Sequence, residues 1–169
     1  MITLTCFCED DIPMLFEIQS DKKLAKLRQA NGTPTTLSDV KTWLDEKNKA
    51  QSREDFILAI RENNNHSIVG YITLKCELDD NSIAQVGIMI GKMNRQGIGT
   101  QSLLRIEALV IENNWYRYLR VIVLQENSIA TRFFLKNNFV PILSSDSTLV
   151  LQKELKAGYF NYDSTSRSR

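Results

Sequence analysis

The sequence predicts an α/β protein with a mixed sheet and helices on its faces. Strand-like segments in the first half of the chain follow one another across short polar turns, which predicts antiparallel pairing. The second half alternates strand, helix, strand and helix, which predicts neighbouring parallel strands. The chain has 169 residues, 43% of them hydrophobic, which is enough for one sizeable core and too little for two comfortable domains.

The first third of the chain predicts one strand and two helices. Ile2 to Phe7 alternates in polarity as a strand does. Asp10 to Pro13 carries the early acidic and proline signals of a helix start, and a polar stretch, Gln19 to Thr35, follows it. From about Thr36 a second helix is predicted by apolar residues at helical spacing, namely Leu37, Val40, Trp43 and Leu44.

The middle of the chain predicts three consecutive strands. Phe56 to Arg61 and Ile68 to Leu78 lie on either side of the asparagine-rich turn Asn63 to His66. Asp79 to Asn81 then turns the chain into Ile83 to Ile90, an apolar, β-branched run that is too short for an ordinary helix.

A two-glycine loop, Asn94 to Thr100, follows this third strand and precedes an amphipathic helix. The apolar face predicted for that helix consists of Leu103, Leu104, Ala108 and Ile111, with Ile106 and Val110 beside it. A helix N-terminus presents unpaired N–H groups and a partial positive charge, so a loop at this place suits a phosphate. Gly97 and Gly99 allow positive φ angles and a close approach of phosphate to the backbone.

The spacing excludes two better-known phosphate loops. A Walker loop requires Lys and then Ser or Thr after its last glycine, and Gly99 is followed by Thr100. A dinucleotide-binding loop requires a third glycine, and Ser102 stands there. A glycine-bearing turn that binds no ligand remains the alternative for this loop taken alone.

A second segment with a specific pattern lies downstream. Leu119 to Leu124 reads as a buried strand, and a helix from Asn127 to Phe139 follows, with Asn127 as its N-cap. Asn137 and Asn138 can supply a left-handed residue at its end. Val140 to Leu143 and Thr148 to Leu151 then predict a closing hairpin around residues 144–147.

Together the two segments resemble the GNAT superfamily of acyl-CoA-dependent N-acetyltransferases, in particular its ribosomal-protein-acetyltransferase-like branch. The family loop, Gln/Arg-x-x-Gly-x-Gly/Ala, is matched by residues 94–99, with Asn94 in place of Gln or Arg. The family pattern Asn-x-x-Ala-x-x-x-Tyr-x-Lys-x-Gly-Phe is matched by residues 127–139, with Phe134 in place of Tyr and Asn138 in place of Gly. The resemblance spans roughly residues 2–156.

The resemblance implies a largely antiparallel sheet of six to seven strands in which two neighbouring parallel strands, Ile83 to Ile90 and Leu119 to Leu124, splay apart. It implies one acetyltransferase domain, residues 1–157. The remaining residues, 158–169, are polar and rich in Ser and Arg, which predicts a flexible tail. It also implies that the chain binds acetyl-CoA as its acyl donor. The implied donor-binding residues are Ile88, Met89, Ile90, Asn94, Arg95, Gln96, Gly97, Ile98, Gly99, Thr100, Asn127, Phe134 and Lys136.

Acetylation of an amine requires removal of a proton, because an alkylamine with a pKa near ~10.4 is mostly protonated at neutral pH. The family's usual acid and base are both replaced here. Phe134 has no proton to give, and Gln85 stands on the strand where related members carry Glu. Ile88 is the candidate for the N–H donor to the developing oxyanion.

Three explanations remain open for the missing acid and base. Catalysis can depend mainly on proximity, with water or a carboxylate handling the proton; the candidate carboxylates are Glu77, Asp79, Asp80 and Glu17. Alternatively, another tyrosine such as Tyr71 reaches the sulfur. In the third explanation the chain is a non-catalytic or regulatory relative that binds acyl-CoA.

The acceptor is expected to be a primary amine on a small molecule, an amino sugar or a peptide N-terminus, attacking directly in a ternary complex. In the family, the segment between the first two helices, Gln19 to Thr36, and the last hairpin loop, Ser144 to Ser147, select it. Lys22, Lys23, Lys26 and Arg28 make the first segment basic, which favours an acceptor that carries phosphate unless they form a solvated face.

Composition argues against several other classes of protein. A net charge of +1 does not favour nucleic acid as a partner, and the chain carries neither an apolar run long enough to cross a membrane nor a signal peptide. The cytoplasm is the expected location, and the expected state is monomer or homodimer. Three cysteines predict reduced thiols, with Cys6 and Cys8 packing on one side of the first strand. With His66 as the sole histidine, no metal site is expected.

Overall fold

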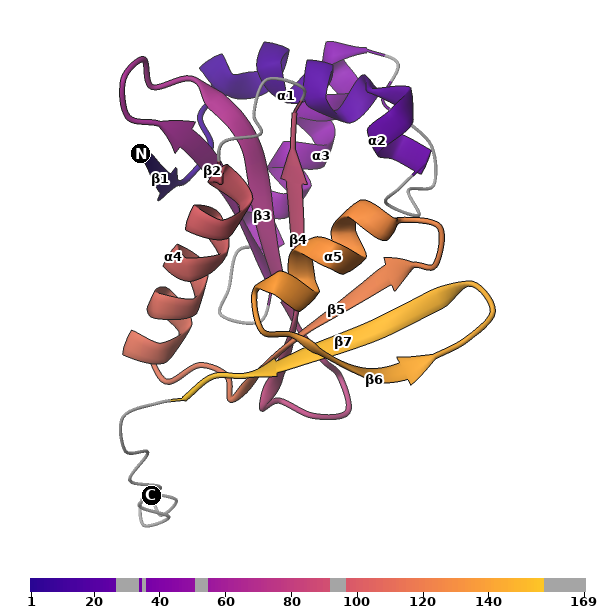
Figure 1. Ribbon diagram of the computed structural model, residues 1–169. Helices are drawn as coiled ribbons and strands as arrows, with labels where there is room; N and C mark the ends of the chain where they lie inside the picture. Colours follow the sequence, from indigo (N-terminus) through magenta and orange to yellow (C-terminus); the bar gives the residue numbers. More distant parts are fainter. Residues whose placement is uncertain (27–33, 35, 51–54, 92–96, 157–169) are drawn as a thin grey trace.

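The computed structural model describes residues 1–26, 34, 36–50, 55–91 and 97–156. Within these residues seven strands form one sheet, in the spatial order β1-β2-β3-β4-β5-β7-β6 (Figure 1). The strands are β1 (Ile2–Thr5), β2 (Asp55–Glu62), β3 (Ile68–Cys76), β4 (Ile83–Ile90), β5 (Tyr118–Leu124), β6 (Val140–Ser144) and β7 (Thr148–Glu154). The predicted α/β class and the predicted mixed sheet are confirmed.

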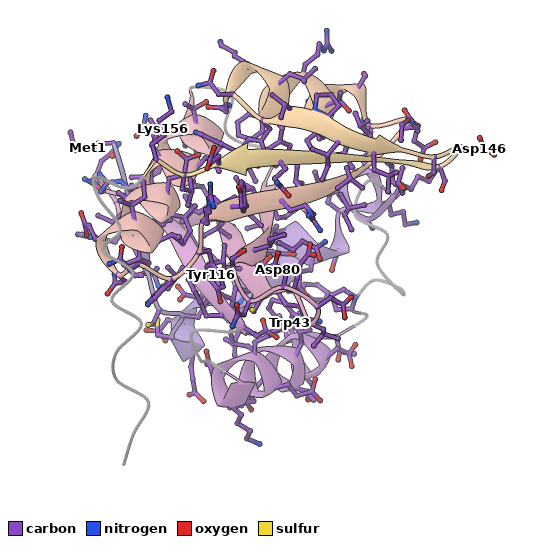
Figure 2. All side chains as sticks on the ribbon, turned by 90° about the horizontal axis from the view of Figure 1, so that it is seen from below. Met1, Trp43, Asp80, Tyr116, Asp146 and Lys156 are labelled. Atoms are coloured by element: carbon purple, nitrogen blue, oxygen red, sulfur yellow. The ribbon has the colours of Figure 1, made fainter. Side chains whose placement is uncertain are left out.

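Helices lie on both faces of the sheet. They are α1 (Ile12–Ser20), preceded by a 3-10 turn (Glu9–Asp11), α2 (Lys22–Lys26), α3 (Leu37–Ala50), α4 (Ile98–Glu112) and α5 (Ser128–Lys136). Leu15 of α1 and Val40 of α3 pack with Ile57 of β2 in one buried cluster. Leu103 of α4 and Phe134 of α5 pack in another, on the opposite face. In Figure 2 Trp43, on α3, accordingly lies across the sheet from α4 and α5.

The pairing of β4 with β5 has the implied splay. β1 to β4 pair antiparallel in sequence order, whereas β4 and β5 run parallel. They pair only at their starts, from Ile83 opposite Tyr118 to Gln85 opposite Arg120. Beyond that point the strands diverge, as Figure 1 shows. We call the facing edges of residues 86–90 and 121–124, which are unpaired in the described part of the chain, the strand split.

Helix α2 lies within the predicted polar stretch and was not predicted from the sequence. Asp21 starts α2, since its carboxylate accepts the backbone N–H of Lys23 at 2.9 Å. After α2, Pro34 is the described residue of that stretch; residues 27–33, which include Arg28, and residue 35 lie outside the described residues, as does the tail. At the other end of the chain, the predicted closing hairpin is confirmed as β6 and β7, and its tip projects away from the sheet at Asp146 (Figure 2).

The predicted apolar face of α4 was partly wrong. Leu104 is 56% exposed and Ala108 is exposed, whereas Glu107 is buried. Glu107 is buried because Nζ of Lys153, on β7, donates a hydrogen bond to its carboxylate at 2.6 Å. A buried ion pair can replace an apolar contact when both charges are satisfied. This pair ties α4 to the second half of the sheet.

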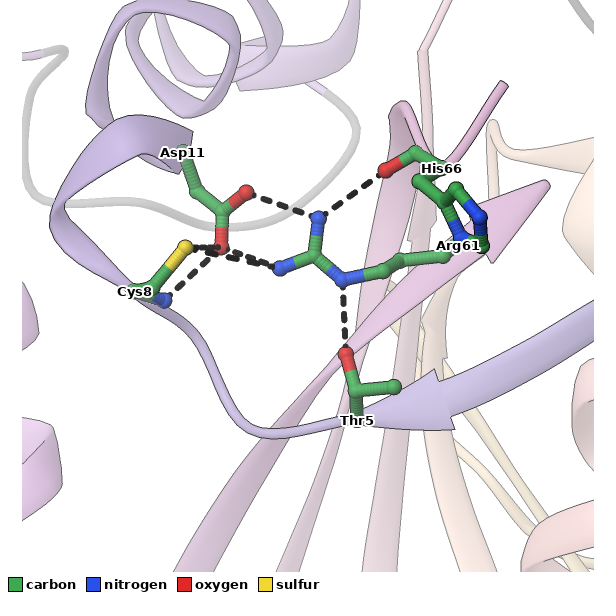
Figure 3. A network of polar contacts seen from close by, with 5 residues as sticks. All are labelled: Thr5, Cys8, Asp11, Arg61 and His66. Atoms are coloured by element: carbon green, nitrogen blue, oxygen red, sulfur yellow. Dashed lines mark hydrogen bonds and ion pairs between the residues drawn. The ribbon is translucent and has the colours of Figure 1, made fainter. Parts of the chain in front are cut away.

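The predicted packing of Cys6 and Cys8 was also wrong, because both are exposed. The polar group that holds this end of the sheet is Arg61 (Figure 3). Its guanidinium donates to both carboxylate oxygens of Asp11 and, through Nε at 2.8 Å, to Oγ1 of Thr5. The thiol of Cys8 contacts the same carboxylate at 3.4 Å. This network fixes the start of α1 against β1 and β2.

Candidate functional site

The first turn of α4 has the features of an anion site. Gly97 is its N-cap, in the left-handed conformation with φ 76° and ψ 8°, and its carbonyl accepts the N–H of Gln101 at 2.9 Å. No side chain of the described residues caps this helix end. The N–H groups of Ile98, Gly99 and Thr100 belong to the first turn and have no acceptor within the helix. The predicted loop residues Asn94, Arg95 and Gln96 lie outside the described residues.

The structure gives the two glycines different roles. Gly97 requires a positive φ, and a Cβ added to it meets no described atom within 4 Å. Gly99 lies inside α4, so of these two glycines only Gly97 uses the freedom to adopt a positive φ. A Cβ on Gly99 would lie 3.0 Å from Cε2 of Phe133, on α5. Among the described residues, nothing fills the space where a Cβ of Gly97 would lie, while Gly99 makes room for a ring.

Backbone alternation shows which groups of β4 face the strand split. The carbonyl of Ile83 and the N–H of Gly91 both bond toward β3, to Glu77 and Val69. In an antiparallel pair the backbone groups of successive residues point to opposite sides. The N–H and C=O groups of Val86, Ile88 and Ile90 therefore face β5. The backbone groups of Met89 face β3. Of the three predicted donor-binding residues on β4, Ile88 and Ile90 are therefore the two whose backbone groups face the strand split.

The same argument applies to β5. The carbonyl of Arg117 and the N–H of Gln125 bond toward β7, to Leu155 and Ser147. The backbone groups of Ile122 and Leu124 therefore face β4 across the strand split. Both edges carry donors and acceptors that the sheet itself does not use in the described part of the chain. An extended polar chain between them can pair with either edge.

Helix α5 has the predicted N-cap but ends at Lys136, three residues before the predicted end at Phe139. Oδ1 of Asn127 accepts the N–H of Ala130 at 3.1 Å, so Asn127 is the N-cap. Asn138 adopts the left-handed conformation with φ 67°, in the position where the family pattern has Gly. Phe134 is buried and packs edge-to-face on Phe139 with ring centroids 5.1 Å apart, so its ring fills core volume. Lys136 is exposed at the last turn.

Gln85 is the last β4 residue that pairs with β5, and Arg120, its partner in register, holds Glu77. The guanidinium of Arg120 donates to Oε2 of Glu77 at 2.6 Å and to Oε1 of Gln152, on β7, at 2.8 Å. Arg120 and Gln152 were missed by the sequence analysis; the available signal was a charged residue within an otherwise apolar strand. The Glu77 carboxylate thus clamps the β3–β4 turn to β5.

The other candidate groups are spread over the molecule. Asp80 shapes the β3–β4 turn: hydrogen bonds from the hydroxyl and the N–H of Ser82 hold the pKa of its carboxyl below the usual value. Asp79 is exposed beside it. Tyr71 is buried on the face covered by α1 and α3, against Trp43. It is therefore on the opposite face of the sheet from Phe134.

Glu17 borders a cavity of about 700 Å³ at the carboxyl end of β4. Ser20, Asp21 and Leu24 contribute from α1, α2 and their junction, and Gly91 contributes from the end of β4. Glu62, from β2, also lines it. Among the described residues, the cavity thus lies between α1 and α2, which belong to or adjoin the segment expected to select the acceptor, and the end of β4.

Among the described residues, no group of three or more His, Cys, Asp or Glu side chains is placed to hold a metal ion. Within the same residues no helix has both the length and the apolar character needed to cross a lipid bilayer.

Comparison with known proteins gives the following matches. A family model described as an acetyltransferase (GNAT) domain matches residues 2–140. A search of curated protein sequences gave no match. Among solved structures, RimL, a ribosomal alpha-N-protein acetyltransferase in complex with coenzyme A, superposes with a TM-score of 0.80 at 14% identity, covering 91% of this chain and 94% of its own.

Two other solved structures have a similar fold. Apo FdhC, described as a nucleotide-linked sugar GNAT, has a TM-score of 0.76 at 15% identity and covers 90% of this chain and 86% of its own. A GCN5-related N-acetyltransferase from Brucella melitensis has a TM-score of 0.74 at 16% identity and covers 90% of this chain and 75% of its own. At these identities the superpositions establish the fold.

Proposed function

Because this chain belongs to the GNAT family of acetyltransferases, we propose that it moves an acetyl group from acetyl-CoA to a primary amine, by direct attack in a ternary complex. The observation that supports this most strongly is the strand split, with unpaired backbone edges on β4 and β5 next to the open first turn of α4. The two features suit the two ends of one ligand: phosphates at the helix, and an amide-bearing arm along the strands.

The residues present fit an acyl-CoA. The pyrophosphate is assigned to the N–H groups of Ile98, Gly99 and Thr100, with Gly97 leaving the space above them open. Asn94, Arg95 and Gln96 belong to the same loop. The pantetheine arm is assigned to the β4 edge at Ile88 and Ile90. Asn127 and Lys136 remain proposed contacts at the two ends of α5. When bound, the thioester supplies an activated acetyl group and a thiolate leaving group.

Ile88 is proposed to stabilise the oxyanion that forms during attack. Its N–H faces the strand split, where a carbonyl oxygen lying along the β4 edge can accept from it. Removing one such donor in other enzymes lowers turnover by about 10²–10³. A backbone donor held by sheet pairing needs no reorganisation during the reaction, which is what this role requires.

We do not assign a general base to Glu77, because its carboxylate is held by Arg120. We propose that positioning supplies most of the rate, since holding two reactants together can lower a barrier by about 7–11 kcal/mol. Water in the acceptor cavity is the proposed carrier of the amine proton. Gln85 and Phe134 have no titratable group with which to take part.

The acceptor is proposed to enter the cavity beside Glu17. Glu17 is among the residues that line it, and a carboxylate there favours an ammonium group over a phosphate. This favours a cationic amine, as on a peptide N-terminus or a small alkylamine, over a phosphate-bearing amino sugar. The sequence-based idea of a basic acceptor segment is less well supported, because Lys22, Lys23 and Lys26 do not line the cavity.

The direct test is incubation with acetyl-CoA and a panel of amines, following release of free thiol, with thermal stabilisation by CoA measured in parallel. Peptide N-termini and alkylamines are expected to release thiol faster than nucleotide-linked amino sugars. CoA stabilisation without amine-dependent thiol release would favour the second candidate, a non-catalytic acyl-CoA-binding relative, which the residues at positions 85 and 134 favour. Absence of stabilisation would exclude both.

A further inference from the structure

Phe133 occupies the place where three elements meet. Its Cε2 and Cζ lie 3.0 and 3.3 Å from the position that a Cβ on Gly99 would take. Cδ1 of Ile90, at the end of β4, lies 3.6 Å from the same point. Phe133 belongs to α5, Gly99 to the first turn of α4, and Ile90 to the β4 edge of the strand split. The ring therefore packs at the corner between the proposed phosphate site and the proposed pantetheine track.

Phe133 differs from its neighbour in exposure. Phe134 is 5% exposed and is surrounded by core, whereas Phe133 is only partly buried. The two rings are perpendicular, with centroids 4.9 Å apart and an interplanar angle of 74°, so Phe134 holds the orientation of Phe133. A ring that is fixed on one side and partly open on the other can serve as a wall for a ligand.

We propose that Phe133 positions the donor, by packing against the pantetheine arm where it leaves the helix end, and that Gly99 is needed because the ring takes the space of its side chain. This inference rests on the proposed function. A donor bound by its phosphates at α4 must turn toward the β4 edge, and it passes Ile90 and Phe133 in doing so. Phe133 thus acts on the arm, while the backbone of α4 acts on the phosphates.

The proposal assigns the pantetheine arm and the phosphates of one ligand to different groups of the protein. It can therefore be tested with two probes, one with the arm and one without it. CoA carries the pantetheine arm, whereas adenosine 3′,5′-bisphosphate lacks it but retains adenosine and phosphate groups. In calorimetric titrations F133A is expected to weaken CoA binding about tenfold, a difference of ~1.4 kcal/mol. Binding of the bisphosphate is expected to change less than about twofold. In turnover assays KM for acetyl-CoA should rise more than kcat falls.

Gly99→Ala supplies an independent test through the same contact. The added methyl group displaces the Phe133 ring, so G99A is expected to weaken CoA binding about fivefold in the wild-type background and less than about twofold in F133A. L135A is the matched control, since Leu135 is on the same helix and 44% exposed, and it should bind CoA as the wild type does.

Several results would overturn the proposal. Wild-type CoA affinity in F133A would do so, and so would equal losses for CoA and the bisphosphate, because a purely structural role affects both. If F133A does not fold, F133L retains apolar volume without the planar ring and takes its place in both titrations. If the wild type itself binds neither probe, the proposed function fails together with this inference.

Discussion

Replacing Gly97 is expected to change the stability of the protein only slightly and the binding of an anion at the start of α4 strongly. Gly97 has φ 76°, a conformation in which a residue with a Cβ is disfavoured by roughly 1–2 kcal/mol. A Cβ there meets no described atom within 4 Å, so no clash adds to this conformational penalty. In a domain of this size, Gly97→Ala is therefore expected to lower Tm by only about 2–8 °C.

The effect on binding should be larger than the effect on the fold. If a pyrophosphate binds the N–H groups of Ile98, Gly99 and Thr100 as proposed, it comes close to the backbone of Gly97, and a methyl group there is expected to obstruct it. Loss of one hydrogen bond to a charged group is worth about 1.5–3 kcal/mol. CoA affinity should accordingly fall roughly 10- to 150-fold.

Gly97→Asn is the matched control for backbone strain, because Asn tolerates the left-handed region better than Ala and still carries a Cβ. Its Tm should lie closer to that of the wild type, while its CoA affinity should fall as in Gly97→Ala. Thermal unfolding and calorimetric titration with CoA measure the two quantities separately. A Gly97→Asn variant that binds CoA with wild-type affinity would refute the obstruction argument.

Three further substitutions test single contacts. Asn127→Ala removes the cap bond to Ala130 and should destabilise the protein by about 1 kcal/mol, measured by urea unfolding. Asp11→Asn breaks the buried pair with Arg61 and should destabilise it by about 3–5 kcal/mol at pH 7, with the difference shrinking in acid. Glu77→Gln should lower kcat less than tenfold, because loss of a general base lowers rates by about 10²–10⁴.

The pH dependence expected for Asp11 follows from the direction of its pKa shift. Burial is the largest single influence and opposes ionisation, but hydrogen bonds from Arg61 and Cys8 outweigh it, so the pKa of Asp11 lies below the usual 3.8. A depressed pKa contributes stability above the unfolded value, and this stability is lost as pH falls through the folded value. Unfolding free energies that differ equally between wild type and Asp11→Asn from pH 7 down to pH 2 would contradict this assignment.

The other two substitutions have their own controls. Asn127→Asp keeps an oxygen that can cap α5, so it should recover most of the stability that Asn127→Ala loses. Unchanged stability in Asn127→Ala would show that the cap contributes nothing. A fall in kcat of more than a hundredfold in Glu77→Gln, with the fold intact, would contradict our proposal and indicate that Glu77 is the general base.

Local sequence signals identified the elements that flank the site. Ile83 to Ile90 and Leu119 to Leu124 were predicted as strands because short β-branched runs favour no other structure, and Asn127 was predicted as an N-cap from its own side-chain chemistry. The left-handed Asn138 also followed from residue type. These features depend on a residue and its neighbours in sequence.

The errors have a common physical cause. Leu104 and Ala108 were predicted on the apolar face of α4 and are exposed, whereas Glu107 is buried because Lys153 reaches it from β7. Gly99 was predicted for its backbone freedom, and the structure shows that it leaves space for Phe133. Cys8 was predicted to pack beside Cys6, and it is exposed, with the guanidinium of Arg61 next to its thiol. In each case the deciding partner is distant in sequence, so no local pattern contains it.

The sequence by itself determined the order of the strands and of the helices other than α2, the glycine loop before α4, the cap of α5 and the resemblance to the acetyltransferases, because turns, caps and periodicity are local properties. Tertiary structure alone decided where β4 and β5 part, that Ile88 and Ile90 face the split, and that Arg120 holds Glu77 there. Strand register and long-range side-chain pairs are fixed only when the whole sheet forms, since each strand edge is defined by its neighbour.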